Sequence, residues 1–393
     1  MKLESKTVHA GDRKKPGSYI PVTTPICTAA SFVYESTEQL DRIFGREEAG
    51  PAYARYDNPT VSALEELVNE LEGGHGTFCC SSGMMAMYIA TVAALVDRPK
   101  RVVAGNVLYG ATTLMLSNIL GSLGVETEYV DMCDAAAVEA AVREVKPGAI
   151  VMETITNPLL RVAPLEKIAE IARAAQAPLI VDNTFATPLL VRPLELGANI
   201  VVHSATKYLS GHGDVLGGVI VSDQPHFETL MTLRRVIGPN LGPFEAYLVM
   251  RGIKTLALRM EKQCANANQL AAWLAAHPAV DRVFFPGDPA HPDAVNVARL
   301  LPKGRYGAMV TLELKNAGQK DVFAFMDRLK MIVRATSLGD VHTMILHPAM
   351  SSHRDLSPKH RARLGIGDNL LRISTGIEAI EDIIADLDQA LKT

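Results

Sequence analysis

The sequence predicts an α/β protein, with a large domain built on a mostly parallel sheet and a smaller α+β domain at the C-terminal end. From residue 60 to about residue 250, short apolar runs of strand length alternate with longer runs of helical periodicity, which is typical of a parallel sheet covered by helices. After that region, a strand of alternating polarity and a final amphipathic helix replace this pattern. The chain has 393 residues, of which 48% are hydrophobic, so it can bury cores of this size.

The chain divides into three parts: an arm (residues 1–59), the large domain (60–250) and the C-terminal α+β domain (251–393). The arm is rich in Pro, Thr and aromatic residues, and its periodicity is too poor to form a core. A segment of this kind either clasps another subunit or stays loose.

In the large domain the first helix is expected from Thr60, with an apolar face from Val61 to Leu71 and an end at Gly73-Gly74. A second helix opens at Met84 and continues through Leu95. The expected strands are Gly76–Cys80, Arg101–Ala104, Val125–Val130, Ala149–Glu153, Leu179–Asp182, Ile200–Val202 and Gly217–Val221.

The C-terminal part begins with a long helix that we expect from about Phe244 to Met260. Ala308–Leu314 alternates like a half-exposed strand, and an apolar stripe from Ile377 to Leu391 predicts the last helix. Arg372 follows an apolar strand run, Asn369–Leu371, so we expect its side chain to point out of a packed element.

The most informative segment is V-V-H-S-A-T-K-Y-L-S-G-H-G-D-V-L-G-G, residues 201–218. A buried strand runs into two hydroxyl residues, Ser204 and Thr206, and then into Lys207 and a glycine-broken loop. This arrangement can hold an amine still beside a phosphate, as a lysine that forms a Schiff base with pyridoxal phosphate requires. Taken alone, such a lysine is more often a solvated surface charge, and such hydroxyl residues more often cap a turn.

Two further segments favour the cofactor interpretation. The run A-P-L-I-V-D-N ends a strand in Asp182, and a carboxylate there could keep the pyridine nitrogen of the cofactor protonated. Ser81-Ser82-Gly83 joins a strand to a helix, where backbone N–H groups make an anion site. The alternatives are a turn residue for Asp182 and ordinary helix capping for the serines. A nicotinamide fingerprint is absent, because no G-x-G-x-x-G joins a strand to a helix.

The chain resembles the Cys/Met-metabolism enzymes that depend on pyridoxal phosphate, which include cystathionine γ-synthase, cystathionine γ-lyase, methionine γ-lyase and the homoserine sulfhydrylases. The motifs H-S-A-T-K-Y-L-S-G-H-G-D, V-D-N-T, L-Y-G, L-M-R-G-I-K-T-L-A-L-R-M and L-R-I-S-T-G-I-E carry the resemblance over nearly the whole chain. It implies the fold of type I pyridoxal-phosphate enzymes, like aspartate aminotransferase, and a homodimer or homotetramer.

The resemblance also implies roles for single residues. Lys207 matches the Schiff-base lysine, and Asp182 matches the partner of the pyridine nitrogen. Tyr109 matches the tyrosine that stacks on the ring and moves protons, and Asn157 matches the residue beside the ring oxygen. The remaining matches are the phosphate-binding residues Ser204, Thr206, Gly83 and Met84, the substrate-carboxylate residues Arg372 and Ser337, and Tyr53 and Arg55, which reach the phosphate of a neighbouring subunit.

Departures from the family pattern concern the substrate. Ala111 stands where methionine γ-lyases characteristically carry a cysteine. After Ser337-Leu338-Gly339 the chain has Asp340 and His342, where cystathionine-processing members usually have a glycine and a glutamate. A mostly neutral His342 should attract the distal ammonium of cystathionine less than a glutamate would, unless Asp340 points into the pocket.

Composition bounds the class of protein. A net charge of −4, with acids and bases interspersed, gives no sign of nucleic acid or of an anionic membrane as a partner. Without an apolar N-terminal segment, a cytoplasmic protein is expected. The five cysteines (Cys27, Cys79, Cys80, Cys133 and Cys264) have no metal-site spacing, and His203, His212 and His347 are expected to be loop or core residues.

Three functions are compatible with these residues and with the resemblance. The first is a lyase that cleaves the C–S bond of methionine or cystathionine to a thiol, ammonia and 2-oxobutanoate. The second is a transferase of the same family, which joins an activated homoserine ester to cysteine or to sulfide. The third is a paralogue that binds the cofactor without catalysis.

Overall fold

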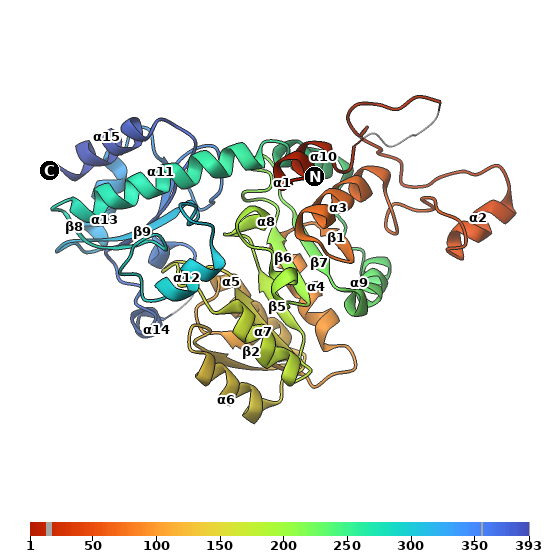
Figure 1. The fold of residues 1–393 in the computed structure, drawn as a ribbon, viewed down its shortest axis with the longest axis horizontal. Coiled ribbons are helices and arrows are strands. Elements are labelled where there is room, and N and C mark those ends of the chain that lie inside the picture. Colours follow the sequence, from red (N-terminus) through yellow and green to blue (C-terminus); the bar gives the residue numbers. More distant parts are fainter. Residues whose placement is uncertain (13–17, 355–356, 393) are drawn as a thin grey trace.

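The computed structural model describes residues 1–12, 18–354 and 357–392. Its larger sheet has seven strands in the order β1-β7-β6-β5-β4-β2-β3 (Figure 1). The strands are β1 (Gly76–Cys80), β2 (Arg101–Gly105), β3 (Glu126–Val130), β4 (Ala149–Glu153), β5 (Leu179–Asp182), β6 (Ile200–Ser204) and β7 (Gly218–Ser222). Only β7 runs antiparallel to its neighbours, so the prediction of a mostly parallel sheet is confirmed.

Both faces of this sheet are covered, because successive strand residues point to opposite sides. Val201 belongs to a core shared with α3, α6, α7 and α10, whereas its neighbour Val202 belongs to a core shared with α4, η1 and α9. The bounds are α3 (Pro59–Glu72), α4 (Gly83–Leu95), α5 (Gly110–Leu114), the π-helical η1 (Met115–Leu120), α6 (Ala135–Val145), α7 (Leu165–Ala174), α8 (Thr187–Leu190), the 3₁₀ turn η2 (Pro193–Leu196), α9 (Gln224–Ile237) and α10 (Pro243–Ile253). In the described part of the chain, no helix is long and apolar enough to cross a membrane.

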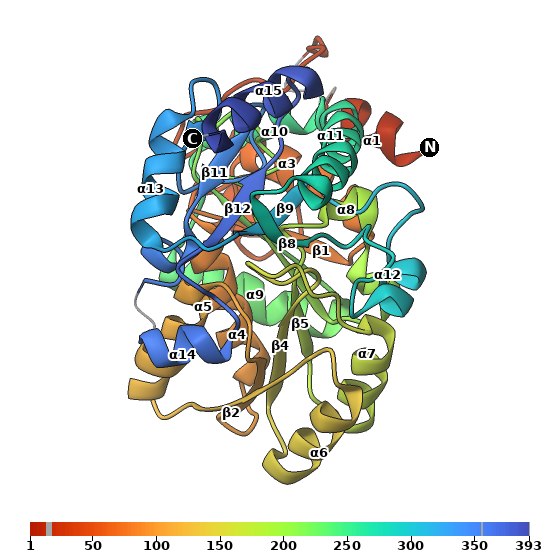
Figure 2. The same ribbon diagram turned by 90° about the vertical axis from the view of Figure 1, so that its left-hand side faces the viewer.

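A second, five-stranded sheet forms the C-terminal part, with the order β10-β11-β12-β9-β8 (Figure 2). Its strands are β8 (Val280–Phe284), β9 (Met309–Leu314), β10 (Val333–Arg334), β11 (Met344–Leu346) and β12 (Leu370–Ser374). Helices α11 (Leu256–Ala276), α13 (Gln319–Arg328) and α15 (Ile380–Leu391) share a core with one face of it. The remaining helices are α12 (Ala294–Leu300), the 3₁₀ turn η3 (Pro348–Met350) and α14 (Pro358–Arg363).

The opposite face of this second sheet is covered along β9, so the expectation of a half-exposed β9 is wrong. Val310 and Leu312 pack on the helices, while Thr311 points the other way and donates a hydrogen bond to the Pro158 carbonyl at 2.6 Å. Thr311 is fully buried. A polar residue at an alternating position therefore lies at the junction with the large domain and not in solvent.

The helix expected from Phe244 to Met260 is two helices, because α10 ends at Ile253 and α11 begins at Leu256. Between them Thr255 leaves the helical conformation, and the Arg259 guanidinium donates to the Gly252 carbonyl at 2.8 Å. The last helix begins at Ile380 and not at Ile377, which is 41% exposed. The division into residues 1–59, 60–250 and 251–393 remains a proposal, and its second boundary falls inside α10.

The N-terminal arm is less irregular than expected, since it holds α1 (Leu3–His9) and α2 (Thr37–Phe44). These helices are too short to show a long apolar period. α1 packs against α3 and α11. α2, in contrast, stands away from the rest of the chain (Figure 1). Several large apolar side chains of the arm are exposed, including Tyr19, Ile20, Val22 and Val33.

Candidate active site

The carboxyl ends of four strands meet at one edge of the large sheet. Glu153, Asp182 and Ser204 end the adjacent parallel strands β4, β5 and β6. Gly218, at the start of β7, pairs with both Ser204 and Cys80, which brings the end of β1 to the same edge. Open α/β sheets bind their ligands at such an edge.

A cavity of about 480 Å³ lies at this edge. Most of the site residues predicted from the sequence line it: Gly83, Met84, Tyr109, Asn157, Asp182, Ser204, Thr206, Lys207 and Arg372. Ser337 adjoins it, because its Oγ accepts a hydrogen bond from Lys207 Nζ at 3.0 Å. The two remaining predicted residues, Tyr53 and Arg55, are not among the residues that line it.

One side of the cavity is formed by the start of α4 and the end of β6. Ser82 caps α4 by accepting a hydrogen bond from the Met85 N–H at 3.1 Å. A Cβ on Gly83 would lie 2.7 Å from Ser204 Cβ, and one on Gly218 would lie 2.0 Å from the Ser82 carbonyl oxygen. Only glycines allow this close approach, which gathers backbone N–H groups and hydroxyls into a cradle suited to a phosphate.

Asp182 is a partly buried carboxylate that lines the cavity. It accepts hydrogen bonds from the Thr184 N–H at 3.0 Å and the Thr184 hydroxyl at 2.5 Å. Burial nevertheless raises its pKa above the ordinary value, against the lowering effect of these bonds and of His203. A cation placed beside Asp182 would lower its pKa again. The position therefore suits the nitrogen of a protonated pyridine ring.

Lys207 lies in the turn that follows β6, and its Nζ is directed to Ser337. Burial and the positive charge of Arg372 lower the pKa of Lys207 from 10.5 to about 8. A larger fraction of its amine is therefore neutral near physiological pH than for a surface lysine. A neutral amine is the form that attacks a carbonyl carbon.

Arg372 reaches the cavity from the other sheet. The sequence pattern predicts that it follows a strand, but it lies in the middle of β12, on the face opposite Leu371 and Ile373. Its Nη1 donates to Asn157 Oδ1 at 2.6 Å and its Nη2 to the Ser337 carbonyl at 3.3 Å.

Burial lowers the pKa of Arg372 to about 10, so the side chain stays charged at neutral pH. Its Nε has no hydrogen-bond partner among the described residues. A charged guanidinium in this position can receive a substrate carboxylate.

Tyr109 precedes α5, and Glu153 holds its backbone. The Tyr109 N–H donates to Glu153 Oε1 at 2.6 Å, while the Asn157 N–H donates to Glu153 Oε2 at 3.1 Å. Burial and the neighbouring Asp182 raise the pKa of Glu153. Neither Glu153 nor Thr184 is among the site residues predicted from the sequence, although the place of Glu153 at the end of a predicted strand was a usable signal.

Tyr53 and Arg55 lie at the base of the arm. The Arg55 guanidinium is 5.5 Å from the Tyr53 ring and 5.0 Å from the Tyr56 ring, and it donates to the Arg235 carbonyl near the end of α9. Their predicted role at a neighbouring subunit stays a prediction.

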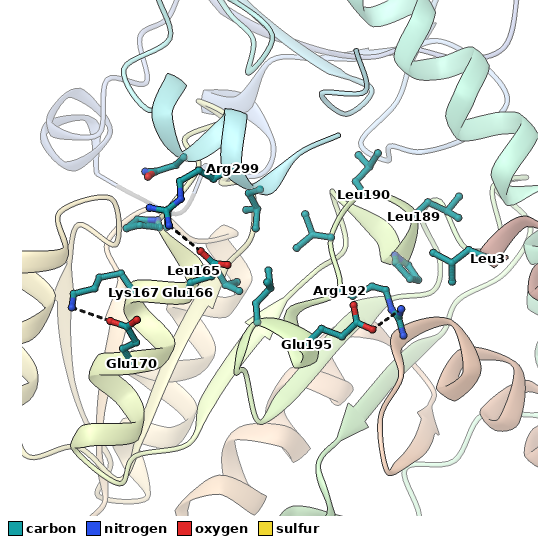
Figure 3. A pocket seen from close by; sticks show the side chains of 17 residues that line it. Leu3, Leu165, Glu166, Lys167, Glu170, Leu189, Leu190, Arg192, Glu195 and Arg299 are labelled. Carbon is teal, nitrogen blue, oxygen red and sulfur yellow. Dashed lines mark hydrogen bonds and ion pairs between the residues drawn. The ribbon is translucent and has the colours of Figure 1, made fainter. Parts of the chain in front are cut away.

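A second cavity, of about 450 Å³, lies between α1, α7, η2 and α12 (Figure 3). Its charged side chains pair with one another: Arg192 with Glu195 at 2.6 Å, Lys167 with Glu170 at 3.0 Å and Arg299 with Glu166 at 3.5 Å. We call the first cavity, at the strand ends, the strand-end cavity. It holds charged groups that are unpaired or whose pKa values are strongly shifted, so it is the better candidate for a catalytic site. Among the described residues, no cluster of three or more His, Cys, Asp or Glu side chains could hold a metal ion.

The strand-end cavity fits pyridoxal phosphate by its donor set. The glycine-lined cradle suits the phosphate, the carboxylate of Asp182 suits the ring nitrogen, and the Lys207 amine suits the aldehyde carbon. These three groups lie in one cavity.

Comparisons with known proteins agree with this geometry. The model of the family described as Cys/Met metabolism PLP-dependent enzyme matches residues 4–392. The chain is 40% identical over 395 residues to L-methionine gamma-lyase of Pseudomonas putida, covering 99% of this chain and 96% of that one. It is 37% identical to O-succinylhomoserine sulfhydrylase of Pseudomonas aeruginosa, covering 99% and 95%.

The fold has close counterparts among solved structures. Cystathionine gamma-lyase from Lactobacillus plantarum, complexed with L-serine, superimposes with a TM-score of 0.91 at 37% identity, over 99% of this chain and 98% of that chain. The type I fold and the pyridoxal-phosphate cofactor expected from the sequence are therefore confirmed. The chain belongs to the family of Cys/Met metabolism PLP-dependent enzymes.

Proposed function

We propose that this enzyme is a γ-lyase that cleaves the C–S bond of methionine to methanethiol, ammonia and 2-oxobutanoate, and that it prefers an uncharged γ-substituent to that of cystathionine. Enzymes of this family are carbon–sulfur lyases or γ-replacement enzymes that use pyridoxal phosphate. The proposed preference for an uncharged γ-substituent rests on the charge of the residues that line the cavity.

The bound cofactor supplies an electron sink for negative charge that develops at Cα of the substrate. Asp182 would keep the ring nitrogen protonated, and Ser204, Thr206 and the start of α4 would hold the phosphate. Arg372 would orient the substrate through its carboxylate. Lys207 Nζ, with a pKa of about 8, can accept a proton from Cα and then donate it to another atom of the substrate.

The cavity offers no obvious partner for a distal ammonium group. Among the described residues that line it, the only carboxylates are Glu153 and Asp182, both at strand ends. Asp340 does not line it, since its Oδ1 accepts the His342 N–H at 3.1 Å and lies 2.9 Å from His342 Nδ1. The hydroxyl residues Thr336, Ser351 and Ser352 line it instead.

A γ-replacement transferase is the second candidate, favoured by the relative that is an O-succinylhomoserine sulfhydrylase. Both reactions begin with loss of the Cα proton and of the γ-substituent, and they differ in whether a thiol then adds. The same residues would serve either reaction, so the products decide between the two functions.

Methionine or O-acetylhomoserine should be processed at least as well as cystathionine. We would measure kcat/KM for each, with sulfide added to O-acetylhomoserine, and identify the products. Methanethiol and 2-oxobutanoate from methionine would support the lyase, and homocysteine from the ester and sulfide would support the transferase. A kcat/KM for cystathionine more than about tenfold above both, roughly 1.4 kcal/mol, would overturn the proposed preference.

A variant with a new carboxylate in the cavity tests whether charge causes this preference. Thr336→Glu should shift the ratio of kcat/KM toward cystathionine by roughly fivefold, about 1 kcal/mol for a partly exposed ion pair. An unchanged ratio would mean that charge in the cavity does not select the substrate.

Capture of pyridoxal phosphate by the cofactor-free enzyme should depend on pH through the Lys207 amine. Because the pKa of Lys207 is lowered to about 8, the rate constant should rise about tenfold per pH unit up to pH 8 and then level off. Stopped-flow absorbance would follow it, with N-α-acetyl-lysine, whose pKa is about 10.4, as the control that rises further. A flat profile between pH 6 and 8 would contradict a titrating Lys207.

We also propose that the enzyme works as a homodimer or homotetramer in the cytoplasm. The exposed apolar side chains of the arm support an assembly, because such groups are usually covered by a partner. The buried, unpaired thiols of Cys79 and Cys80 fit a reducing compartment.

A further inference from the structure

Glu153 is a buried acid in the strand-end cavity that the proposed chemistry does not use. It is 7% exposed and lies at the end of β4, beside Asp182 in the register of β4 and β5. Two carboxylates on neighbouring strands of a buried site repel each other, which is unfavourable unless other bonds compensate. The carboxylate of Glu153 makes two such bonds, one from each oxygen.

These bonds join two segments that are far apart in the sequence. Oε1 accepts the Tyr109 N–H at 2.6 Å, and Oε2 accepts the Asn157 N–H at 3.1 Å. Tyr109 begins α5, whereas Asn157 lies in the loop after β4. One side chain therefore sets the distance between two backbone segments that both line the cavity.

Further hydrogen bonds connect Asn157 to Lys207. Asn157 Oδ1 accepts from Arg372 Nη1 at 2.6 Å, and Arg372 Nη2 donates to the Ser337 carbonyl at 3.3 Å. Ser337 Oγ accepts from Lys207 Nζ at 3.0 Å. An unbroken chain of contacts thus runs from the Tyr109 backbone through Glu153 and Arg372 to the Lys207 amine.

We propose that Glu153 is a positioning residue, which holds Tyr109 and Asn157 in register and through Asn157 orients Arg372 toward the substrate carboxylate. It needs to be a glutamate because two N–H donors require two acceptor oxygens, and the amide of glutamine has only one. The inference rests on the proposed roles of Tyr109 and Arg372, but its structural half can be measured without any substrate.

The test compares Glu153→Gln with Asp386→Asn. Asp386 lies in α15, outside the cavity, and its carboxylate accepts the N–H groups of Lys330, Met331 and Ile332 at 2.8–2.9 Å. The control variant thus removes a similar tie between backbone segments at a distant place. Hydrogen exchange of the peptides containing Tyr109 and Asn157, with and without pyridoxal phosphate, and steady-state kinetics with the best substrate would be measured for both.

In Glu153→Gln we expect at least about tenfold faster exchange in one of the two peptides, roughly the loss of one hydrogen bond of about 1.4 kcal/mol. KM for the amino-acid substrate should rise about tenfold, with kcat reduced as well. Asp386→Asn should quicken exchange only around Lys330–Ile332 and leave both constants within about twofold. Glu153→Asp, whose shorter side chain cannot reach both amides, should behave like Glu153→Gln and replaces it if that variant does not fold.

Two results would overturn the proposal. Unchanged exchange in the Tyr109 and Asn157 peptides would show that Glu153 does not hold these segments. Faster exchange with kcat and KM like those of Asp386→Asn would show that it ties the backbone without affecting the site. If the proposed substrate is wrong, the exchange result is unaffected and the kinetics are repeated with the substrate that is turned over.

Discussion

Replacing Lys207 by alanine is expected to reduce turnover by roughly 1,000-fold or more, the usual range for losing a group that both attacks a carbon and transfers a proton. The reason is the amine of Lys207, which is partly buried, has its pKa lowered to about 8, and donates to Ser337 at the strand-end cavity. Borohydride treatment of the wild-type enzyme should fix the cofactor to the peptide that contains Lys207. Absorbance and peptide mass measure both results.

A surface lysine provides the control for this variant. Lys167 pairs with Glu170 at 3.0 Å, and both side chains are more than half exposed. Lys167→Ala should keep activity within about twofold, because an exposed ion pair contributes little. Fixation of the cofactor at another lysine, or turnover by Lys207→Ala near the wild-type rate, would show that the site is misidentified.

A mixture of two inactive variants should recover activity if the arm completes the site of a neighbouring subunit. Arg55→Ala and Lys207→Ala each damage every site of their own homodimers. In a hybrid dimer, the Arg55→Ala subunit would keep Lys207 and receive an intact Arg55 from its partner. Random exchange of subunits should then restore about a quarter of the wild-type activity, since half of the dimers would carry one intact site of two.

The control mixture combines two variants whose substituted residues are both supplied by a chain to its own cavity. Lys207→Ala mixed with Asp182→Asn leaves no hybrid site intact, because both residues line the cavity of one chain. It should recover nothing, although mass spectrometry shows hybrids. An Arg55→Ala and Lys207→Ala mixture no more active than this control would mean that Arg55 serves only its own subunit, where it donates to the Arg235 carbonyl.

The residues of the proposed site that follow one another closely along the chain could be predicted from the sequence. Lys207, Ser204 and Thr206 follow one strand, and Asp182 ends another. Gly83 opens a helix, so strand ends and helix starts predict where their side chains lie. The alternating sheet of the large domain followed from periodicity for the same reason.

Only the tertiary structure decided the features that depend on segments distant in the sequence. Arg372 faces the cavity because β12 continues through it beside β9, and β9 is buried because the large domain covers its second face. α10 ends where the Arg259 side chain donates to the Gly252 carbonyl. Glu153 accepts a hydrogen bond from an N–H 44 residues earlier in the chain, and its proposed role depends on that bond. Local propensity cannot specify such contacts, because they form only when packing brings the segments together.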